Sequence, residues 1–247
     1  MINTQAFLDN TFTIIDNVMN KEQENILKAA DICAEAIAKG GVIQVFGTGH
    51  SLGFGNELGG RVGSLVPVHT ITIGDFVSHG LYTYADFKDM DNIFERRPGI
   101  AGRFYELYEI SDNDVFIIIS NSGINGLVID LADTARSKGQ KVIVVTSLDH
   151  TLNSDSRHPS GKKLMDHGDV VIDNCGPMGD ALLPTEDGGK IGAVSSITGI
   201  YIAQSLAIAT VAKLQEKNVE VPVLRFEDSK ENMEFNQYLL NKYAGRI

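Results

Sequence analysis

Apolar and polar positions along this chain follow two patterns. From Thr4 to Ala38 the apolar residues recur at helical spacing with a polar break at Asn20-Lys21, so this segment predicts two helices or one bent helix. Short apolar runs rich in β-branched residues predict strands, and they occupy residues 42–46, 65–73, 115–119, 141–146 and 169–173. A helical pattern over 127–137 joins two of these runs, and Gly139 is placed to end it. Strand, helix and strand in this order predict a parallel sheet.

Two segments depart from these patterns. The interval from Asp75 to Arg103 carries aromatic residues among Gly and Asp. We expect it to form a long loop over the edge of the sheet where a ligand would bind, in the manner of a lid. The segment from Ile191 to Ala212 has no charged residue and is long enough to span a bilayer. Because hydroxyl and amide side chains interrupt it, we expect a helix buried inside the protein rather than a membrane span.

The composition of the chain limits the classes of partner that it can bind and the cellular compartment that we expect. The 247 residues include 21 Lys and Arg against 32 Asp and Glu, and the net charge of −11 argues against a nucleic-acid or anionic-membrane surface. Cys33 and Cys175 have neither CxxC spacing nor a disulfide framework, so reduced thiols in a cytoplasmic protein are the simplest interpretation. The opening MINTQAFLDNTF lacks the basic region and apolar core of a secretion signal. We expect a single domain in the cytoplasm.

Two loops carry the candidate chemistry. Residues 115–125, VFIIISNSGIN, form an apolar strand followed by small hydroxyl, amide and glycine residues, and then a helical pattern begins. Ser120 and Ser122 offer hydroxyls, Gly123 lets backbone N–H groups approach a ligand, and the helix start adds partial positive charge. These features favour a bound anion, although Ser, Asn and Gly also favour an ordinary turn. The loop Gly47-Thr-Gly-His-Ser51 follows another strand, and two such loops line one crevice when their strands are parallel neighbours.

With these loops in this order, the chain resembles the sugar isomerase (SIS) domain family, a phosphosugar-binding α/β fold. The resemblance rests on the S-x-S-G-x-[T/N] pattern at 120–125, the strand KVIVVTS, and Ser160 before Leu164, and it covers roughly residues 40–214. It is closer still to bacterial SIS proteins described as phosphoheptose isomerase-like, through GHS…E…R, SRHPSGK, DN…GDA and the ending N…Y..RI. It implies an α/β fold, a three-layer doubly wound parallel sheet of the flavodoxin-like type. Helices over residues 1–39 precede this core, and a tail over 215–247 follows it.

The resemblance also implies where a sugar phosphate binds. The implied binding residues lie in the second loop and at neighbouring strand ends, and they are Gly49, His50, Ser51, Ser120, Asn121, Ser122, Gly123, Asn125 and Ser147. Asn125 stands where threonine is common, and its amide can still donate a hydrogen bond. The hydroxyls of Ser51 and Ser147 have an alternative role, which is to cap a helix or turn.

Glu57 is the candidate general base. The segment Glu57-Leu-Gly-Gly-Arg61 is similar to one that follows the first loop of phosphoheptose isomerases, and Arg61 joins the candidate binding residues. A carboxylate one to two helical turns beyond Ser51 points toward the same crevice, where desolvation suits it to proton abstraction. The alternative is a helix-surface salt bridge from Glu57 to Arg61 at i+4.

The insertion SDSRHPSGKK supplies further candidates. His158 is suited to ring opening or to moving a proton between oxygens near neutral pH, although a loop histidine is more often a surface residue. The density of basic and hydroxyl groups in an acidic chain makes Arg157 and Ser160 candidate ligand contacts. His69, on an apolar strand, is expected to pack in the core. Asp180 and Glu186 are expected to be solvated loop carboxylates or groups behind the site.

The chain also departs from the families it resembles. The segment from Gly47 to Glu57 is about one helical turn shorter than in phosphoheptose isomerases, and it lacks the histidine that those enzymes carry four residues before the glutamate. The uncharged segment from Ile191 to Ala212 also lacks a histidine that would complete a metal site. Lys190 stands where glucosamine-phosphate synthases carry a glutamate, so the base of that family is absent. We therefore expect no metal ion and no cofactor.

The leading hypothesis is an aldose–ketose sugar-phosphate isomerase that abstracts the C2 proton. A phosphosugar lyase of the etherase type begins with the same step, and a non-catalytic sugar-phosphate sensor is the third alternative. No basic helix-turn-helix segment is attached, so we expect no nucleic-acid partner, and we expect no membrane partner. The long N-terminal helices and the oligomers common among SIS proteins predict a homodimer or homotetramer.

Overall fold

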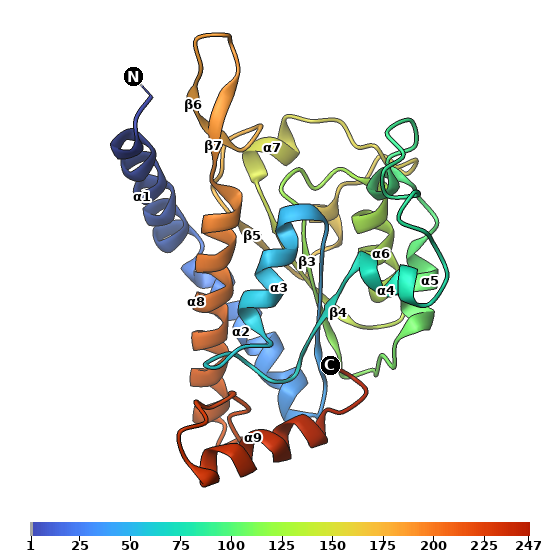
Figure 1. Cartoon of the computed structure of the whole chain (residues 1–247), viewed down its shortest axis with the longest axis vertical. Helices are drawn as coiled ribbons and strands as arrows, with labels where there is room; N and C mark the ends of the chain where they lie inside the picture. Colours follow the sequence, from blue (N-terminus) through green and yellow to red (C-terminus); the bar gives the residue numbers. More distant parts are fainter. Residues whose placement is uncertain (1) are drawn as a thin grey trace.

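A five-stranded parallel sheet forms the centre of the protein. The computed structural model describes residues 2–247, and its strands are β1 (Ile43–Gly47), β2 (Val68–Ile71), β3 (Val115–Ile119), β4 (Lys141–Thr146) and β5 (Val170–Asp173). They lie in the order β2-β1-β3-β4-β5, with helices covering both faces (Figure 1). This is the flavodoxin-like doubly wound order, so the predicted fold class is confirmed.

Both faces of the sheet are buried, which explains the continuous apolar runs of its strands. Alternate side chains point to opposite faces. Ile43, Val45 and Ile117 pack toward α2 (Gln23–Ala38), α3 (Leu52–Leu58) and α8 (Ser195–Glu216). On the other face, Phe46, Phe116 and Ile118 pack with residues of α4 (Ile73–Ser78), α5 (Ala101–Leu107) and α6 (Gly126–Ser137). The remaining short elements are η1 (Gly49–Ser51), η2 (Phe94–Arg96), α7 (Leu148–Leu152) and η3 (Leu164–His167).

The two ends of the chain add helices outside this core. The N-terminal segment forms two helices, α1 (Thr4–Lys21) and α2, separated at Glu22, so the first of the two predicted forms is confirmed. The predicted tail contains α9 (Lys230–Lys242). It lies at the opposite end of the molecule from the hairpin of β6 (Ala181–Pro184) and β7 (Lys190–Ala193) (Figure 1). After it, Arg246 Nη2 contacts the buried carboxylate of Asp114 at 2.6 Å. That carboxylate also accepts a hydrogen bond from the backbone N–H of Val42, so it ties the tail to the amino end of β1.

The excursion between β2 and β3 is ordered by aromatic side chains. Five of them contact one another and join the core on that face of the sheet: Phe76, Tyr82, Phe87, Phe94 and Phe104.

The strand expected over 65–73 is shorter than predicted. Its first part runs through Pro67, which has no backbone N–H to donate, and α4 begins at residue 73.

The helix expected from Ile191 begins four residues later than predicted. A hairpin of β6 (Ala181–Pro184) and β7 (Lys190–Ala193) precedes it, and Gly192 has a φ of +85°, which a right-handed helix does not accommodate. The helix is also less buried than predicted. The helix α8 packs against α2 and α3 on one side and exposes the other, where Ile200 is 42% and Ile208 68% exposed. Within residues 2–247, α8 is the one helix whose length and composition would allow it to cross a membrane.

Candidate functional site

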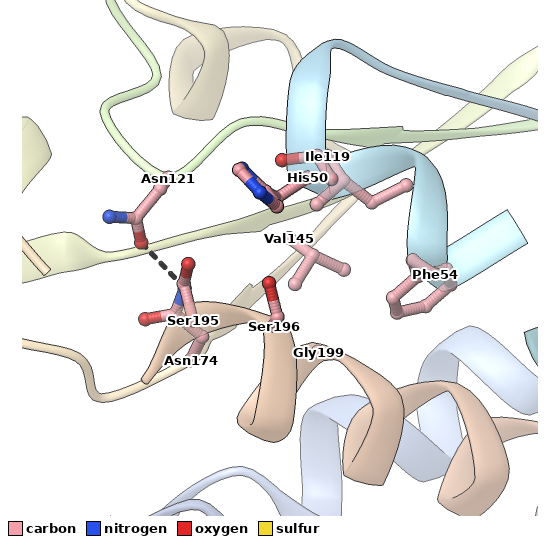
Figure 2. A pocket seen from close by; sticks show the side chains of 10 residues that line it. His50, Phe54, Ile119, Asn121, Val145, Asn174, Ser195, Ser196 and Gly199 are labelled. Atoms are coloured by element: carbon pink, nitrogen blue, oxygen red, sulfur yellow. Dashed lines mark hydrogen bonds between the residues drawn. The ribbon is translucent and has the colours of Figure 1, made fainter. Parts of the chain in front are cut away.

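A narrow cavity opens at the carboxyl edge of the sheet, where the strand order reverses between β1 and β3. Open α/β sheets bind ligands at this point. Three groups of elements line the cavity: η1 and α3 after β1, the ends of β3, β4 and β5, and the first turn of α8 (Figure 2). Its lining residues are His50, Ser51, Phe54, Ile119, Asn121, Val145, Asn174, Ser195, Ser196 and Gly199. We call this hollow of about 20 Å³ the switch-point cavity, and it is too small to enclose a whole sugar.

Two amide side chains face each other in this cavity. Asn174 Nδ2 donates to Asn121 Oδ1 at 2.8 Å, and the Asn174 side chain in turn accepts from the backbone N–H of Gly176 at 2.8 Å (Figure 2). These bonds fix the orientation of both amides. The carbonyl oxygen of Asn121 is occupied, so its Nδ2 group is the atom that remains to donate to a ligand.

The loop after β3 holds the predicted phosphate-binding residues together. Ser120 Oγ accepts from the backbone N–H of Gly123 at 3.1 Å, and Gly123 has a φ of +64°. Asn125 is buried, and its Oδ1 accepts from Arg157 Nη1 at 2.8 Å. No side chain caps α6 at Asn125, so the first backbone N–H groups of this helix remain available as donors.

The two serines at other strand ends are placed differently. Ser51 lines the switch-point cavity and makes no side-chain capping bond to α3. Ser147 is fully buried, its hydroxyl donates to the carbonyl of Gly176 at 2.6 Å, and it accepts from the N–H of His150 at 3.1 Å. Ser147 therefore caps α7, as the alternative expected, and its hydroxyl hydrogen is already donated.

Glu57 lies beyond the lining of the cavity. It is one helical turn past Phe54, and its carboxylate accepts from Arg61 Nη1 at 2.9 Å and from Gln204 Nε2. Its side chain is 18% exposed. The salt bridge that was the alternative to catalysis is thus present, and Gln204 of α8 is a partner that sequence reasoning did not find.

The insertion with His158 is fastened to α6. His158 Nε2 lies 2.9 Å from Asp130 Oδ1, and its Nδ1 lies 2.7 Å from Ser160 Oγ, so both ring nitrogens have partners. Arg157 contacts Asn125 of the loop after β3. The lining of the switch-point cavity includes none of Arg157, His158 and Ser160. Their roles in binding or catalysis stay predictions.

Sequence reasoning missed several residues at the site. Asn174 directly follows β5, and the two serines Ser195 and Ser196 open α8. The rule that ligands bind beyond strand carboxyl ends would have found Asn174 if it had been applied to β5. Asp180, expected in a solvated loop or behind the site, accepts from the N–H groups of Val194 and Ser195, and it thereby fixes the start of α8. Glu186 is exposed near the hairpin tip.

The residues around Glu57 do not fit a metal ion. Within residues 2–247, no group of three or more His, Cys, Asp or Glu side chains is placed to hold one. The immediate partners of Glu57 are a guanidinium and an amide, and the guanidinium would repel a cation.

Other side chains that could react contribute to packing instead. Burial lowers the pKa of His69, which contacts Gln44 Oε1 at 2.7 Å and packs against Tyr108, in keeping with a structural role. Burial also raises the pKa of Cys33 and Cys175 to about 12, so both remain protonated thiols at neutral pH.

The sequence and fold have clear relatives. The family described as SIS domain matches residues 6–147, and a domain of unknown function, DUF2529, matches residues 98–220. The UPF0309 protein lin2794 of Listeria innocua is 35% identical over 248 residues, covering 100% of this chain and 97% of that protein.

Solved structures of other proteins share the fold. Phosphoheptose isomerase GmhA from Neisseria gonorrhoeae superposes with a TM-score of 0.57 at 16% identity, covering 84% of this chain and 96% of that one. The Vibrio vulnificus NanR protein complexed with ManNAc-6P gives a TM-score of 0.50 at 13% identity, covering 97% of this chain and 67% of that one. At these identities the likeness is one of fold.

Proposed function

The chain belongs to the SIS domain family, and on this premise we propose that it binds a sugar phosphate at the carboxyl edge of its sheet. One observation carries the proposal. Ser51 and Asn121 both line the cavity at the strand-order reversal, and the loop that holds Asn121 leads into α6, whose N-terminus has no capping bond from the Asn125 side chain. Such donors and the helix dipole suit a phosphate. Fold relatives named for phosphoheptose isomerisation and for a complex with ManNAc-6P support this ligand class.

We propose further that the bound sugar is isomerised between aldose and ketose. Glu57 takes the proton from C2 and returns it to C1, while a second proton moves from the C2 oxygen to the C1 oxygen with His158 assisting. The position of Glu57 supports this role, because it lies one turn beyond the cavity-lining Phe54 and its carboxylate is partly exposed. The reaction needs that carboxylate to leave Arg61 and Gln204 when substrate binds.

A sensor is the second candidate, and one observation favours it. His50 is the only ionisable residue among the ten that line the switch-point cavity. A protein that binds a sugar phosphate without turnover needs no carboxylate at this position. It would leave the contacts of Glu57 with Arg61 and Gln204 intact.

The exposed face of α8 supports a homodimer or homotetramer. Ile208 lies between two grooves of about 460 and 360 Å³, and it lines both of them. Neither groove is lined by a charged residue, so two copies of this acidic chain can meet there without repulsion. About a two-fold axis, Ile208 of one copy can enter a groove of the other copy, and the same contact then occurs in reverse. We therefore propose that copies of the chain meet through α8. We also propose that the protein is cytoplasmic and has no nucleic-acid or membrane partner.

The deciding experiment follows deuterium from D₂O into a panel of hexose, hexosamine, N-acetylhexosamine, muramic and heptose phosphates. Exchange at C2 with an isomer of equal mass supports isomerisation, and loss of a C3 substituent supports a lyase. Glu57→Gln should abolish the exchange. The matched control is Glu24→Gln, which alters another carboxylate in an i,i+4 pair, with Lys28 at 2.8 Å, and should exchange as the wild type does.

Three other results bear on the proposal. Exchange that survives in Glu57→Gln would remove Glu57 from the mechanism. Binding of one compound without any exchange, equal in wild type and Glu57→Gln, would establish the sensor instead. Failure of every compound to bind would overturn sugar-phosphate binding itself.

A further inference from the structure

A second, larger hollow lies on the other side of the first loop. Residues Gly47–Gly49 form one wall, and the excursion between β2 and β3 forms the wall opposite. We call it the lid cavity, and its side-chain lining is Thr48, Leu52, Ile73, Phe87, Ile93, Phe94 and Glu95. Its volume of about 380 Å³ lies in the range of small-molecule pockets, whereas the switch-point cavity measures about 20 Å³.

The two cavities share one loop. Gly47–Gly49 border the lid cavity, and the next two residues, His50 and Ser51, border the switch-point cavity. Gly49 carries no side chain and has a φ of +57°, and no heavy atom lies within 4 Å of the place a Cβ would take. A ligand whose phosphate lies beside Ser51 therefore meets no side chain at Gly49 on the way to the lid cavity.

The lining of the lid cavity combines two kinds of group. Five side chains are aliphatic or aromatic, and Phe94 is held by contacts with Phe76 and Phe87. The only charged side chain of the lining is Glu95, whose Oε2 accepts from the hydroxyl of Thr48. Its Oε1 has no donor among residues 2–247, and the neighbouring Arg97 pairs instead with Asp86 at 4.0 Å and Asp89 at 3.7 Å.

Glu95 is half-buried, and its Oε1 is open to a donor from a ligand, beside side chains that favour apolar contact. A sugar hydroxyl or an ammonium group would satisfy Glu95 but leave the apolar walls without a partner. An acylamino group satisfies both, because its amide N–H donates to the carboxylate and its alkyl part contacts the aliphatic and aromatic side chains.

Resting on the proposed function, we propose that the lid cavity receives the acylamino substituent of the ligand. The ligand class is then an N-acylated amino sugar phosphate. In this arrangement Glu95 Oε1 accepts the amide N–H, the acyl group lies among Ile73, Phe87 and Ile93, and the phosphate remains beside the loop after β3.

The test is calorimetric titration of the full chain with gluco, manno and galacto hexose 6-phosphates, each as the parent sugar, the free amine and the N-acetyl derivative. In at least one series the N-acetyl compound should bind about tenfold or more tighter than its parent, as a hydrogen bond to a charged group implies. Glu95→Met removes the acceptor, and Ile73→Trp fills the cavity from its edge. Each should bring the N-acetyl affinity down to that of the parent sugar. Glu106→Met, an exposed carboxylate on α5, should change nothing.

The outcomes distinguish failure of the acylamino assignment from failure of the proposed function. Equal affinity for parent and N-acetyl sugars would overturn the acylamino assignment while sugar-phosphate binding stands. Tightest binding of the free amine would also overturn it, as would an N-acetyl preference that survives both variants. No binding of any compound would overturn the proposed function together with the inference.

Discussion

At the scale of single residues, Gly123 shows why the loop after β3 has glycine where it turns. Its φ of +64° lies in the left-handed region, and a Cβ there would lie 2.8 Å from Thr151 Oγ1 and 2.9 Å from Thr146 Oγ1. Those two hydroxyls are hydrogen-bonded to each other at 2.8 Å, so neither moves freely. Backbone conformation and neighbouring side chains therefore both exclude a side chain at this position.

Gly123→Ala is expected to lower the free energy of unfolding by about 2–4 kcal/mol, combining left-handed strain with overpacking. It should also weaken sugar-phosphate binding, because the loop amides shift. Urea denaturation measures the first effect, and titration measures the second. Gly139→Ala is the matched control, since its φ of +92° imposes the strain but nothing lies within 4 Å of its Cβ position. Equal losses in the two variants would show that the contacts with Thr146 and Thr151 do not matter.

The loops at 47–51 and 120–125 could be found in the sequence because each follows an apolar run and contains small polar residues. Asn174 could not be paired with Asn121 in this way, since 53 positions separate them and they meet only because β4 pairs with β3 on one side and with β5 on the other. The partners of Glu57 show the same limit. Arg61 is visible at i+4, but Gln204 lies on a helix 147 positions later.

At the scale of elements, the β6–β7 hairpin positions the first turn of α8. Asp180, with a φ of +71°, stands at the base of the hairpin, and its Oδ1 accepts from the N–H groups of Val194 at 3.0 Å and Ser195 at 2.7 Å. Its Oδ2 accepts from Ser195 Oγ at 2.7 Å. This carboxylate therefore orients Ser195 and fixes the start of the helix turn that carries Ser196, and both serines line the switch-point cavity.

Asp180→Ala should cost about 1–2 kcal/mol of unfolding free energy, the usual effect of removing a helix cap. It should also lower sugar-phosphate affinity, because Ser195 and Ser196 lose their fixed position. Chemical denaturation and titration are the measurements. Asp187→Ala, at the exposed tip of the same hairpin, should leave both values near those of the wild type. A loss in stability without any loss in affinity would separate the α8 start from ligand binding.

The central strands and their helices were predictable from sequence because their apolar periods are clear. The hairpin was not, since Lys190–Ala193 is only four residues long and no charged residue separates it from the uncharged segment of α8. The exposure of α8 was equally hidden. An uncharged helix of this composition is expected to be buried, and sequence alone does not distinguish burial within one chain from burial between two.

At the scale of the whole molecule, the exposed face of α8 determines the expected assembly. Ile208→Glu places a carboxylate on the side chain that separates the two grooves, so desolvation and like-charge repulsion should shift the protein from oligomer to monomer at micromolar concentration. Sedimentation velocity measures the change. Leu240→Glu on α9, a residue 43% exposed, is the control and should leave the mass unchanged. A wild-type protein that sediments as a monomer would contradict the interface.

The neutral lining of the switch-point cavity has a consequence for kinetics. His50 is its only ionisable residue, while the chain as a whole carries a net charge of −11. An incoming phosphate is therefore repelled at long range and attracted only within reach of local donors. Dissolved ions screen that repulsion over about 10 Å at 0.1 M. Association should thus accelerate as ionic strength rises, the reverse of the behaviour of proteins that steer anions with basic surfaces.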